Sequence, residues 1–272
     1  ITLVNILTGA CFISFSGIWV AWSGVHPSVS AFYRVFFGAL FLFFPCFVNR
    51  EFRPLTAKMS AMVCLCGLCF AGDLLCWHAS IDYIGPGLAT IIGNFQVFIL
   101  TFISVMFLGK KVTLRFIASV PLAITGLFLI IGFHWSELSP GYHVGILLGL
   151  ITALFYSGFI ITLGKIQTMQ AEPLFFYNLL LVSISSAFFI GLFILFSGTG
   201  FRIPSFSSLG SLLGLALLSQ TVGWTFISKG LSRIAPFIAG IILLLQPALA
   251  FIWDVLIFDR PTSLTNWLGV LI

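Results

Sequence analysis

The stretch from Leu243 to Asp259, "LLLQPALAFIWDVLIFD", combines a long apolar run with residues that hydrocarbon disfavours. Its length is close to what a helix needs to cross a bilayer. It nevertheless contains the amide Gln246, the carboxylate Asp254, and Pro247, which removes one backbone hydrogen bond and kinks a membrane helix. Such residues are tolerated in a membrane where they face protein or a water-filled cavity. The stretch therefore predicts a spanning helix with one side toward the interior of a helix bundle.

The rest of the chain shares this apolar character. Of its 272 residues 60% are hydrophobic and 7% are charged, whereas a soluble domain has about 25% charged residues. Runs long enough to span a membrane recur between short loops with turn residues. The first is too long for a cleavable signal peptide and reads as a true first helix. The sequence predicts an all-α membrane protein with ten transmembrane helices, at about 1–23, 28–48, 58–80, 85–108, 112–132, 143–164, 172–197, 208–228, 234–258 and 262–272.

The basic residues are distributed unevenly among the loops. Nine lie in the loops that follow the second, fourth, sixth and eighth predicted spans, and two, Arg202 and Arg260, lie in the loops that follow the odd-numbered spans. Loops rich in Lys and Arg stay in the cytoplasm. This bias predicts that both termini lie in the cytoplasm, and we expect the protein to lie in a bacterial inner membrane.

The chain also repeats itself at an offset of 150 residues. Residues 84–114, "IGPGLATIIGNFQVFILTFISVMFLGKKVTL", align without a gap on residues 234–264, "IAPFIAGIILLLQPALAFIWDVLIFDRPTSL". In this alignment Pro86 meets Pro236 and Gln96 meets Gln246. A repeat of five spans is odd, so the second copy has the opposite orientation in the membrane, and the charge bias reverses accordingly. We therefore expect two inverted five-helix repeats, 1–135 and 136–272, around a central cavity, as in many secondary transporters.

The closing segment "QPALAFIWDVLIFDRPTSLTNWLGVLI" (246–272) resembles the end of an EamA-type repeat of the drug/metabolite transporter superfamily. It has the central proline, the acidic residue Asp259 at the next turn, and "L…WLG" opening the last helix. The first-half counterpart departs from the pattern with Val97 in place of a proline and Lys110 near the place of the acid. The resemblance covers nearly the whole chain. It implies ten helices around a central cavity, alternating access, and often export of small metabolites or amino acids.

Two polar-xxx-Trp pairs lie in the equivalent third and eighth spans. Asp73 precedes Trp77 by four residues, and Gln220 precedes Trp224 by four. Residues four apart share one helix face, and tryptophan offers a flat surface to aromatic or cationic ligands. We predict that both pairs line the cavity, over the alternative that the indoles anchor the membrane interface or pack between helices.

Further polar residues within the predicted spans extend this candidate site. His78 could bind substrate or carry protons, although a packed, hydrogen-bonded histidine is an equal alternative. Asn94, Gln96 and Gln246 could bind an amino or carboxyl group or tie helices together, and Tyr156 is either a cavity residue or an interface anchor. The predicted substrate-binding residues are Asp73, Trp77, His78, Asn94, Gln96, Tyr156, Gln220, Trp224 and Gln246.

Three charged residues in or near the spans have other predicted roles. We predict that Asp254 acts as a gate or an inter-helix tether, rather than as a proton carrier, with Arg34 or Arg202 as conceivable partners. Arg34 and Lys229 are expected to extend their charged ends out of the membrane.

The sequence shows no serine elbow, zinc spacing or phosphate loop, so we expect neither an enzyme nor a cofactor or metal. The six cysteines lie in apolar runs, and we interpret "CLCGLC" (64–69) as packing residues rather than soft-metal ligands. The predicted partners are a small-molecule substrate and membrane lipid, without nucleic acid, and a monomer is expected, with a dimer left open. The favoured function is secondary transport of amino acids or similar small polar or aromatic compounds, and the family resemblance implies export. A passive channel for the same compounds and a non-transporting membrane scaffold are the alternatives.

Overall fold

A computed structural model describes residues 2–107, 109, 118–119, 121–122, 125–126, 128–129, 140–170, 172, 174–259 and 261–272. Within these residues the regular structure is entirely helical, which agrees with the predicted all-α class. The helices are α1 (Thr2–Ser14), α2 (Ser16–Ser23), α3 (Pro27–Val48), α4 (Ala57–Gly93), α5 (Gln96–Met106), α7 (Pro140–Thr168), α8 (Phe175–Ser197), α9 (Phe206–Gly214), the π-helix η2 (Leu215–Gly223), α10 (Trp224–Leu231), α11 (Pro236–Ile242), α12 (Leu245–Phe258) and α13 (Leu264–Leu271).

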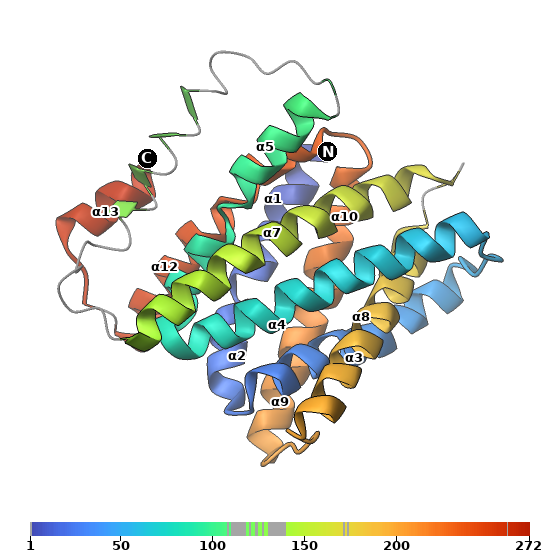
Figure 1. The fold of residues 1–272 in the computed structure, drawn as a ribbon, viewed down its shortest axis with the longest axis horizontal. Coiled ribbons are helices and arrows are strands. Elements are labelled where there is room, and N and C mark those ends of the chain that lie inside the picture. Colours follow the sequence, from blue (N-terminus) through green and yellow to red (C-terminus); the bar gives the residue numbers. More distant parts are fainter. Residues whose placement is uncertain are drawn as a thin grey trace.

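Seven helical segments of the described chain are long and apolar enough to cross a membrane. One of them, Ala57–Met106, has 50 residues, about twice the length of a single crossing. It bends at Gly85, whose φ of 78° is open to glycine at little cost, and Pro86 begins the next helical stretch. In Figure 1 the chain runs one way along α4 and returns through α5. This segment therefore supplies the predicted third and fourth spans.

The predicted number of ten spans is only partly tested by the described residues. The predicted spans 1–23, 28–48, 143–164, 172–197, 208–228 and 234–258 each coincide with one observed helical segment, with ends that differ by a few residues. The predicted span 112–132 lies largely outside the described residues. The predicted span 262–272 is represented by α13, an eight-residue helix at the end of the chain. The total of ten stays a prediction.

The molecule has apolar side chains on its surface and polar ones inside. Phe44, Phe196 and Leu195 are 71%, 88% and 68% exposed, whereas Arg34, Asp73, Asn94 and many serines and threonines are buried. A protein in water has the reverse distribution of charged groups, while polar groups inside a membrane turn toward the bundle interior. The chain is therefore a multi-pass membrane protein.

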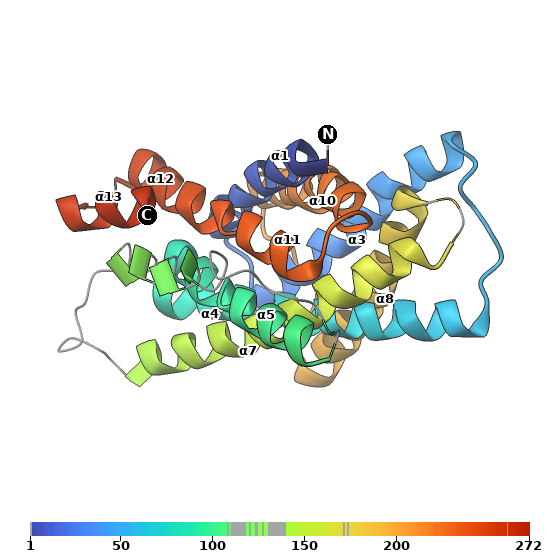
Figure 2. The ribbon, with the colours of Figure 1, turned by 90° about the horizontal axis from the view of Figure 1, so that it is seen from above.

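Three helix pairings organise the bundle. α4 packs along α7, α3 along α8, and α1 along α10 and η2. Seen from above, α1, α10, α11, α12 and α13 lie on one side of the bundle, and α4, α5 and α7 lie on the other (Figure 2). Small residues allow the close approach of α4 and α7, because a Cβ on Gly145 would lie 2.6 Å from Ile84 Cγ2.

The repeated segments have the same interruption in the helix. In the first half the helix stops at Gly93 and resumes at Gln96, and in the second it stops at Ile242 and resumes at Leu245. Each break is a tight turn, in which Phe95 N–H donates to Ile92 O at 3.0 Å and Leu244 N–H donates to Ile241 O at 3.0 Å. The gapless alignment at an offset of 150 thus matches the two breaks to within one residue.

The halves differ in how the helix before each break is reached. Gly85 alone separates Ile84 from Pro86, whereas residues 232–235 separate α10 from Pro236. The second connection is three residues longer. It accounts for the change in offset from 147 at the two polar-xxx-Trp pairs to 150 at the two prolines.

Two tyrosines make reciprocal contacts between the halves. Tyr33 of α3 donates its hydroxyl to Phe201 O at 2.8 Å, in the loop that follows α8. Tyr177 of α8 donates its hydroxyl to Arg53 O at 2.7 Å, in the loop that follows α3. Each helix of the α3–α8 pair therefore holds the loop of the other.

Candidate functional site

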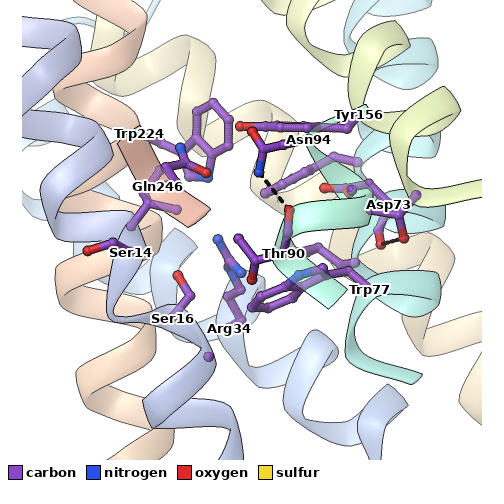
Figure 3. A pocket seen from close by; sticks show the side chains of 16 residues that line it. Ser14, Ser16, Arg34, Asp73, Trp77, Thr90, Asn94, Tyr156, Trp224 and Gln246 are labelled. Carbon is purple, nitrogen blue, oxygen red and sulfur yellow. Dashed lines mark hydrogen bonds between the residues drawn. The ribbon is translucent and has the colours of Figure 1, made fainter. Parts of the chain in front are cut away.

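A cavity lies at the centre of the bundle, between helices from both halves of the chain (Figure 3). It has about 500 Å³ of empty space, a figure that includes its open mouth. It is lined by Ile13, Ser14, Ser16, Gly17, Arg34, Phe70, Asp73, Leu74, Trp77, Thr90, Gly93, Asn94, Thr152, Tyr156, Trp224 and Gln246.

Irregular backbone surrounds this cavity. The break at Phe15 between α1 and α2 carries Ser14 and Ser16, and the two breaks of the repeated segments carry Asn94 and Gln246 next to them. The π-helix η2 ends directly before Trp224. Non-helical backbone at membrane depth is tolerated where it is buried in protein or lines a cavity, and π-bulges are frequent at functional sites. The irregular backbone is therefore consistent with a functional cavity at this place in the bundle.

Pro247 accommodates the break in the second half but is not needed to form a break. It is the third residue of α12, within the first turn, where backbone N–H groups have no partner inside the helix. The first half has Val97 at the equivalent position and breaks all the same, with Val97 N–H donating to Asn94 O at 3.1 Å. The helix-breaking property is therefore shared by the two repeated segments and does not depend on proline.

Several buried polar atoms around the cavity have no hydrogen-bond partner among the described residues. They are Ser16 Oγ, Asn94 Oδ1, Tyr156 Oη, Trp224 Nε1 and Gln246 Nε2. The side chain of Gln246 lies within reach of the Tyr156 hydroxyl, but no well-formed hydrogen bond joins the two groups. Buried polar groups are normally hydrogen-bonded, so such a set indicates a site for water or a ligand.

Two buried charges also line the cavity. Arg34 of α3 is 3% exposed and Asp73 of α4 is 7% exposed. No nitrogen of Arg34 lies within 4 Å of a carboxylate oxygen of Asp73, so the two side chains form no direct ion pair in the described structure. Arg34 Nε donates to Gln220 Oε1 at 3.4 Å, and its guanidinium carbon lies 5.8 Å from the centre of the Trp77 ring.

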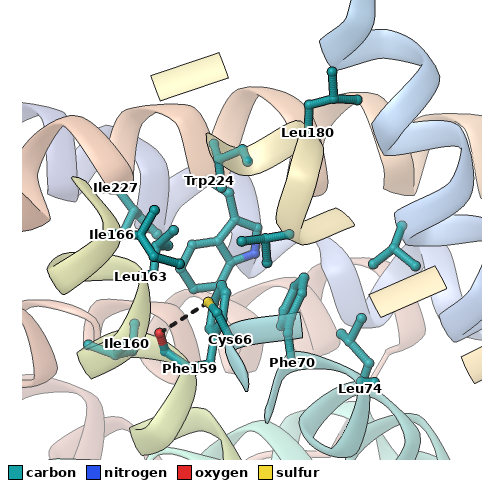
Figure 4. Packing of buried hydrophobic residues seen from close by; sticks show 14 of the residues in the cluster. Cys66, Phe70, Leu74, Phe159, Ile160, Leu163, Ile166, Leu180, Trp224 and Ile227 are labelled. Atoms are coloured by element: carbon teal, nitrogen blue, oxygen red, sulfur yellow. Dashed lines mark hydrogen bonds between the residues drawn. The ribbon is translucent and has the colours of Figure 1, made fainter. Parts of the chain in front are cut away.

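An aromatic cluster forms one end of the cavity. Phe70 and Phe159 stack with ring centres 4.1 Å apart, and Trp224 meets Phe159 edge-on at 4.6 Å. Beyond them Cys66, Leu163 and Ile166 are fully buried (Figure 4). On α4 and α7 these residues lie on the side of the cavity toward the loop that joins α3 and α4. Packed apolar side chains thus close the cavity toward that end of the bundle.

The structure brings six of the nine predicted substrate-binding residues together at this cavity. They are Asp73, Trp77, Asn94, Tyr156, Trp224 and Gln246. Three others lie near it without lining it. His78 Nδ1 is 2.6 Å from Ser30 Oγ between α4 and α3, Gln96 is fully buried beside the first break, and Gln220 binds Arg34 and, through Nε2 at 3.1 Å, Ser183 Oγ. Their roles stay predictions.

The predicted gate residue Asp254 is buried in α12 and does not line the cavity. Its neighbour Trp253 donates Nε1–H to Ser14 Oγ at 2.9 Å, which joins α12 to α1 beside the cavity. The expectation that Arg34 extends out of the membrane is wrong, because Arg34 is buried and held by Gln220.

Sequence reasoning missed Arg34, Phe70 and the hydroxyl residues Ser14, Ser16, Thr90 and Thr152 as cavity residues. Arg34 lies only seven residues after Pro27, the first residue of α3, and so resembles a residue near a membrane surface. The available signal was its position directly after Tyr33, which corresponds to Tyr177 in the second half and so belongs to a part of the helix that contacts the protein. The hydroxyl residues offered none, since serine and threonine are common in membrane helices.

Comparisons with known proteins agree with this architecture. The model of the EamA-like transporter family matches residues 1–132 and 143–272. A solved crystal structure, described only as that of a protein, shares 13% identity and has a TM-score of 0.79 over 99% of this chain and 92% of its own. That likeness concerns the fold alone. No curated protein sequence matches the chain significantly. Since the family model covers both halves, the chain belongs to the EamA-like transporter family.

Proposed function

We propose that this protein is a secondary transporter that exports amino acids or similar small polar or aromatic compounds across the bacterial inner membrane by alternating access. The observation that carries the proposal is the central cavity, where unpartnered polar atoms, two buried charges and aromatic rings meet. Sites for small ligands combine apolar walls with a few polar groups that fix orientation. Membership of a transporter family supports a transported ligand over a bound cofactor.

The proposed mechanism uses two inverted repeats, residues 1–135 and 136–272. The paired helix breaks and the reciprocal contacts of Tyr33 and Tyr177 support this symmetry. In such transporters one repeat rocks against the other around a site near the midplane. With both termini in the cytoplasm, the aromatic cluster of Phe70, Phe159 and Trp224 closes the cytoplasmic side, and its separation would open that side.

Counterflow in proteoliposomes tests this function. Vesicles are loaded with an unlabelled amino acid and diluted into a buffer that contains a trace of the same amino acid with a label. The labelled compound should transiently reach a higher concentration inside than outside, because a carrier exchanges substrate through one site. Each of the twenty standard amino acids is tested in turn, with protein-free vesicles as the control. Flux that rises without saturation and shows no counterflow would favour a passive channel. Absence of any flux would favour a scaffold.

Cysteine labelling tests the proposed orientation. In a cysteine-free background, Arg53→Cys should react with a membrane-impermeant maleimide only from the cytoplasmic side, and Ser205→Cys only from outside. Both residues are exposed. Arg53 lies in the loop that contacts Tyr177 near the start of α8, and Ser205 lies in the loop that follows the end of α8. Labelling of both from the same side would contradict the arrangement.

A further inference from the structure

The cavity contains one positive and one negative group on different helices, and each of them has unused binding capacity. Arg34 projects from α3 and Asp73 from α4, and Figure 3 shows the two side chains reaching the cavity from different sides. The described structure contains no direct ion pair between them. Because both groups line the same cavity, a ligand bound there has access to each of them.

The guanidinium of Arg34 is anchored to the protein through one of its three nitrogens. Nε donates to Gln220 Oε1, and Gln220 Nε2 is in turn fixed by Ser183 Oγ at 3.1 Å. The aromatic rings of Trp77 and Phe70 lie 5.8 and 6.0 Å from its central carbon. The two terminal nitrogens make no hydrogen bond with the described residues, so they remain available as donors. A guanidinium with free terminal nitrogens matches a carboxylate in a two-point geometry.

The carboxylate of Asp73 needs hydrogen-bond donors, whereas the guanidinium of Arg34 needs acceptors. The Asp73 carboxylate accepts no hydrogen bond from the described residues, although the residue is only 7% exposed. Asn94 adds a second free acceptor, Oδ1, to the same cavity. An ammonium group supplies three donors and would satisfy both. Trp224 Nε1 and Gln246 Nε2 are two further donors without a partner at the same cavity, and they suit the anionic end of a ligand.

Leaving charges in a membrane interior without close partners is costly. We propose that the cavity recognises zwitterions, binding the carboxylate of the ligand through Arg34 and its ammonium through Asp73, with Trp77, Phe70 and Trp224 around the substituent. This inference rests on the proposed function, which it sharpens: a compound with both charges is preferred over one with either charge alone. The competing explanation is that the two charges only stabilise the helix bundle through water.

Binding to the purified full-length protein in detergent tests the inference without requiring transport. The probes are triads that share a substituent, such as L-phenylalanine, phenethylamine, which lacks the carboxylate, and 3-phenylpropionate, which lacks the ammonium. Equivalent triads are made for leucine and alanine. Tryptophan fluorescence and thermal shift report affinity. At least one zwitterion should bind about tenfold or more tightly than both of its relatives, as expected for loss of a charge-assisted hydrogen bond.

Two substitutions should each remove one part of the preference for the zwitterion. Arg34→Gln should lose the preference over the amine and keep the preference over the acid. Asp73→Asn should lose the preference over the acid and keep the preference over the amine. This crossed pattern does not arise from partial unfolding, which would weaken all three ligands together. The control is Asp82→Asn, which removes an exposed carboxylate from the same helix, α4, outside the cavity lining, and it should keep both preferences.

The outcomes separate this inference from the proposed function. Equal binding of zwitterion, amine and acid in every triad, or no binding of any zwitterion by the wild-type protein, would overturn zwitterion recognition, even if counterflow of another compound were found. Selective zwitterion binding without counterflow would support the inference and remove the transport function. If the variants do not fold, the wild-type triads alone decide.

Discussion

The two halves of the molecule share their backbone design and differ in the chemistry they bring to the cavity. Both have a helix break next to a glutamine, and both have a tyrosine that holds a loop of the other half. At the offset that relates Tyr33 to Tyr177, however, Arg34 corresponds to Asn178. At the offset that relates Trp77 to Trp224, Asp73 corresponds to Gln220. Charges in the first half are replaced by amides in the second.

These amides make bonds to protein where the charges leave capacity for a ligand. Asn178 Nδ2 donates to Gln167 Oε1 at 2.8 Å, and Gln220 connects Arg34 to Ser183. A symmetric scaffold can therefore carry an asymmetric site: the first half presents the charges, and the second supports them and supplies Phe159 and Trp224 to the aromatic end of the cavity. Under the proposed mechanism, the substrate would stay with the charged half while the other half moves.

The largest expected effect separates the two equivalent tryptophans. Trp224 is 2% exposed and packs against Phe70, Phe159 and Tyr156, so Trp224→Ala should lower the free energy of unfolding by about 3–5 kcal/mol. Trp77 is 9% exposed and has one face at the cavity, so Trp77→Ala should cost less. Both should reduce transport. Denaturant unfolding in detergent measures stability, and Trp22→Ala at an exposed site is the control. Equal losses at the two cavity tryptophans would remove the distinction between the halves.

The next effect concerns the support of Arg34. A Cβ on Gly38 would clash with Gln220 Cγ, so Gly38→Ala should displace Gln220 and cost roughly 1–3 kcal/mol. The second half has Val182 at the corresponding position, which shows that the space is needed on one side only. Gly210→Ala is the matched control, since a Cβ there meets nothing within 4 Å, and it should be neutral or slightly stabilising. A melting temperature unchanged by Gly38→Ala would mean that Gln220 moves freely.

A smaller, pH-dependent effect distinguishes the two tyrosine contacts. Next to the Tyr177 contact, burial raises the pKa of Glu51, against hydrogen bonds from the Tyr177 and Phe176 backbone and the charge of Lys229, which lower it. A carboxyl whose pKa is raised on folding favours its protonated form in the native state. Its contribution to stability is therefore gained as the pH falls through the raised pKa and is lost as the pH rises through it.

The test is the melting temperature of wild type and Glu51→Gln as a function of pH. The neutral variant should be slightly more stable than wild type near pH 7, and the difference should disappear below the ordinary glutamate pKa of about 4.3. Tyr33→Phe, at the reciprocal contact, should leave the pH dependence as in wild type. A wild-type protein that becomes relatively less stable on acidification through this range would contradict the assignment to Glu51.

The smallest effect is expected at the helix breaks themselves. Because the first half breaks without a proline, Pro247→Val should keep the second break and change stability by less than about 1 kcal/mol. Val97→Pro should cost somewhat more, since it removes the hydrogen bond from Val97 N–H to Asn94 O. Thermal unfolding together with counterflow measures both. Loss of transport in Pro247→Val with normal folding would show that the proline has a role of its own.

Much of the fold could be predicted because it depends on local pattern. Apolar runs, turn residues and the 150-residue repeat identified the helical segments that the structure describes, and the repeat alignment matched both helix breaks. Asp73, Asn94 and Gln246 were found at the cavity for a similar reason: a polar residue within an apolar run must face the bundle interior. Trp77 and Trp224 followed from their four-residue spacing to a polar residue. The rule for polar residues predicts that such a residue faces the interior of the bundle. It does not predict whether the residue lines the cavity or contacts a neighbouring helix.

The sequence by itself determined the membrane-spanning class, the family resemblance and the set of polar residues excluded from lipid. Only the tertiary structure decided how that set is divided. It placed Asp73 and Gln246 at the cavity, and it turned His78 toward Ser30 and Gln220 toward Arg34. It also moved Arg34 from an expected membrane surface to the centre. The physical reason is that hydrocarbon excludes all polar groups alike, whereas the choice between a protein partner and an open cavity depends on which helices pack together.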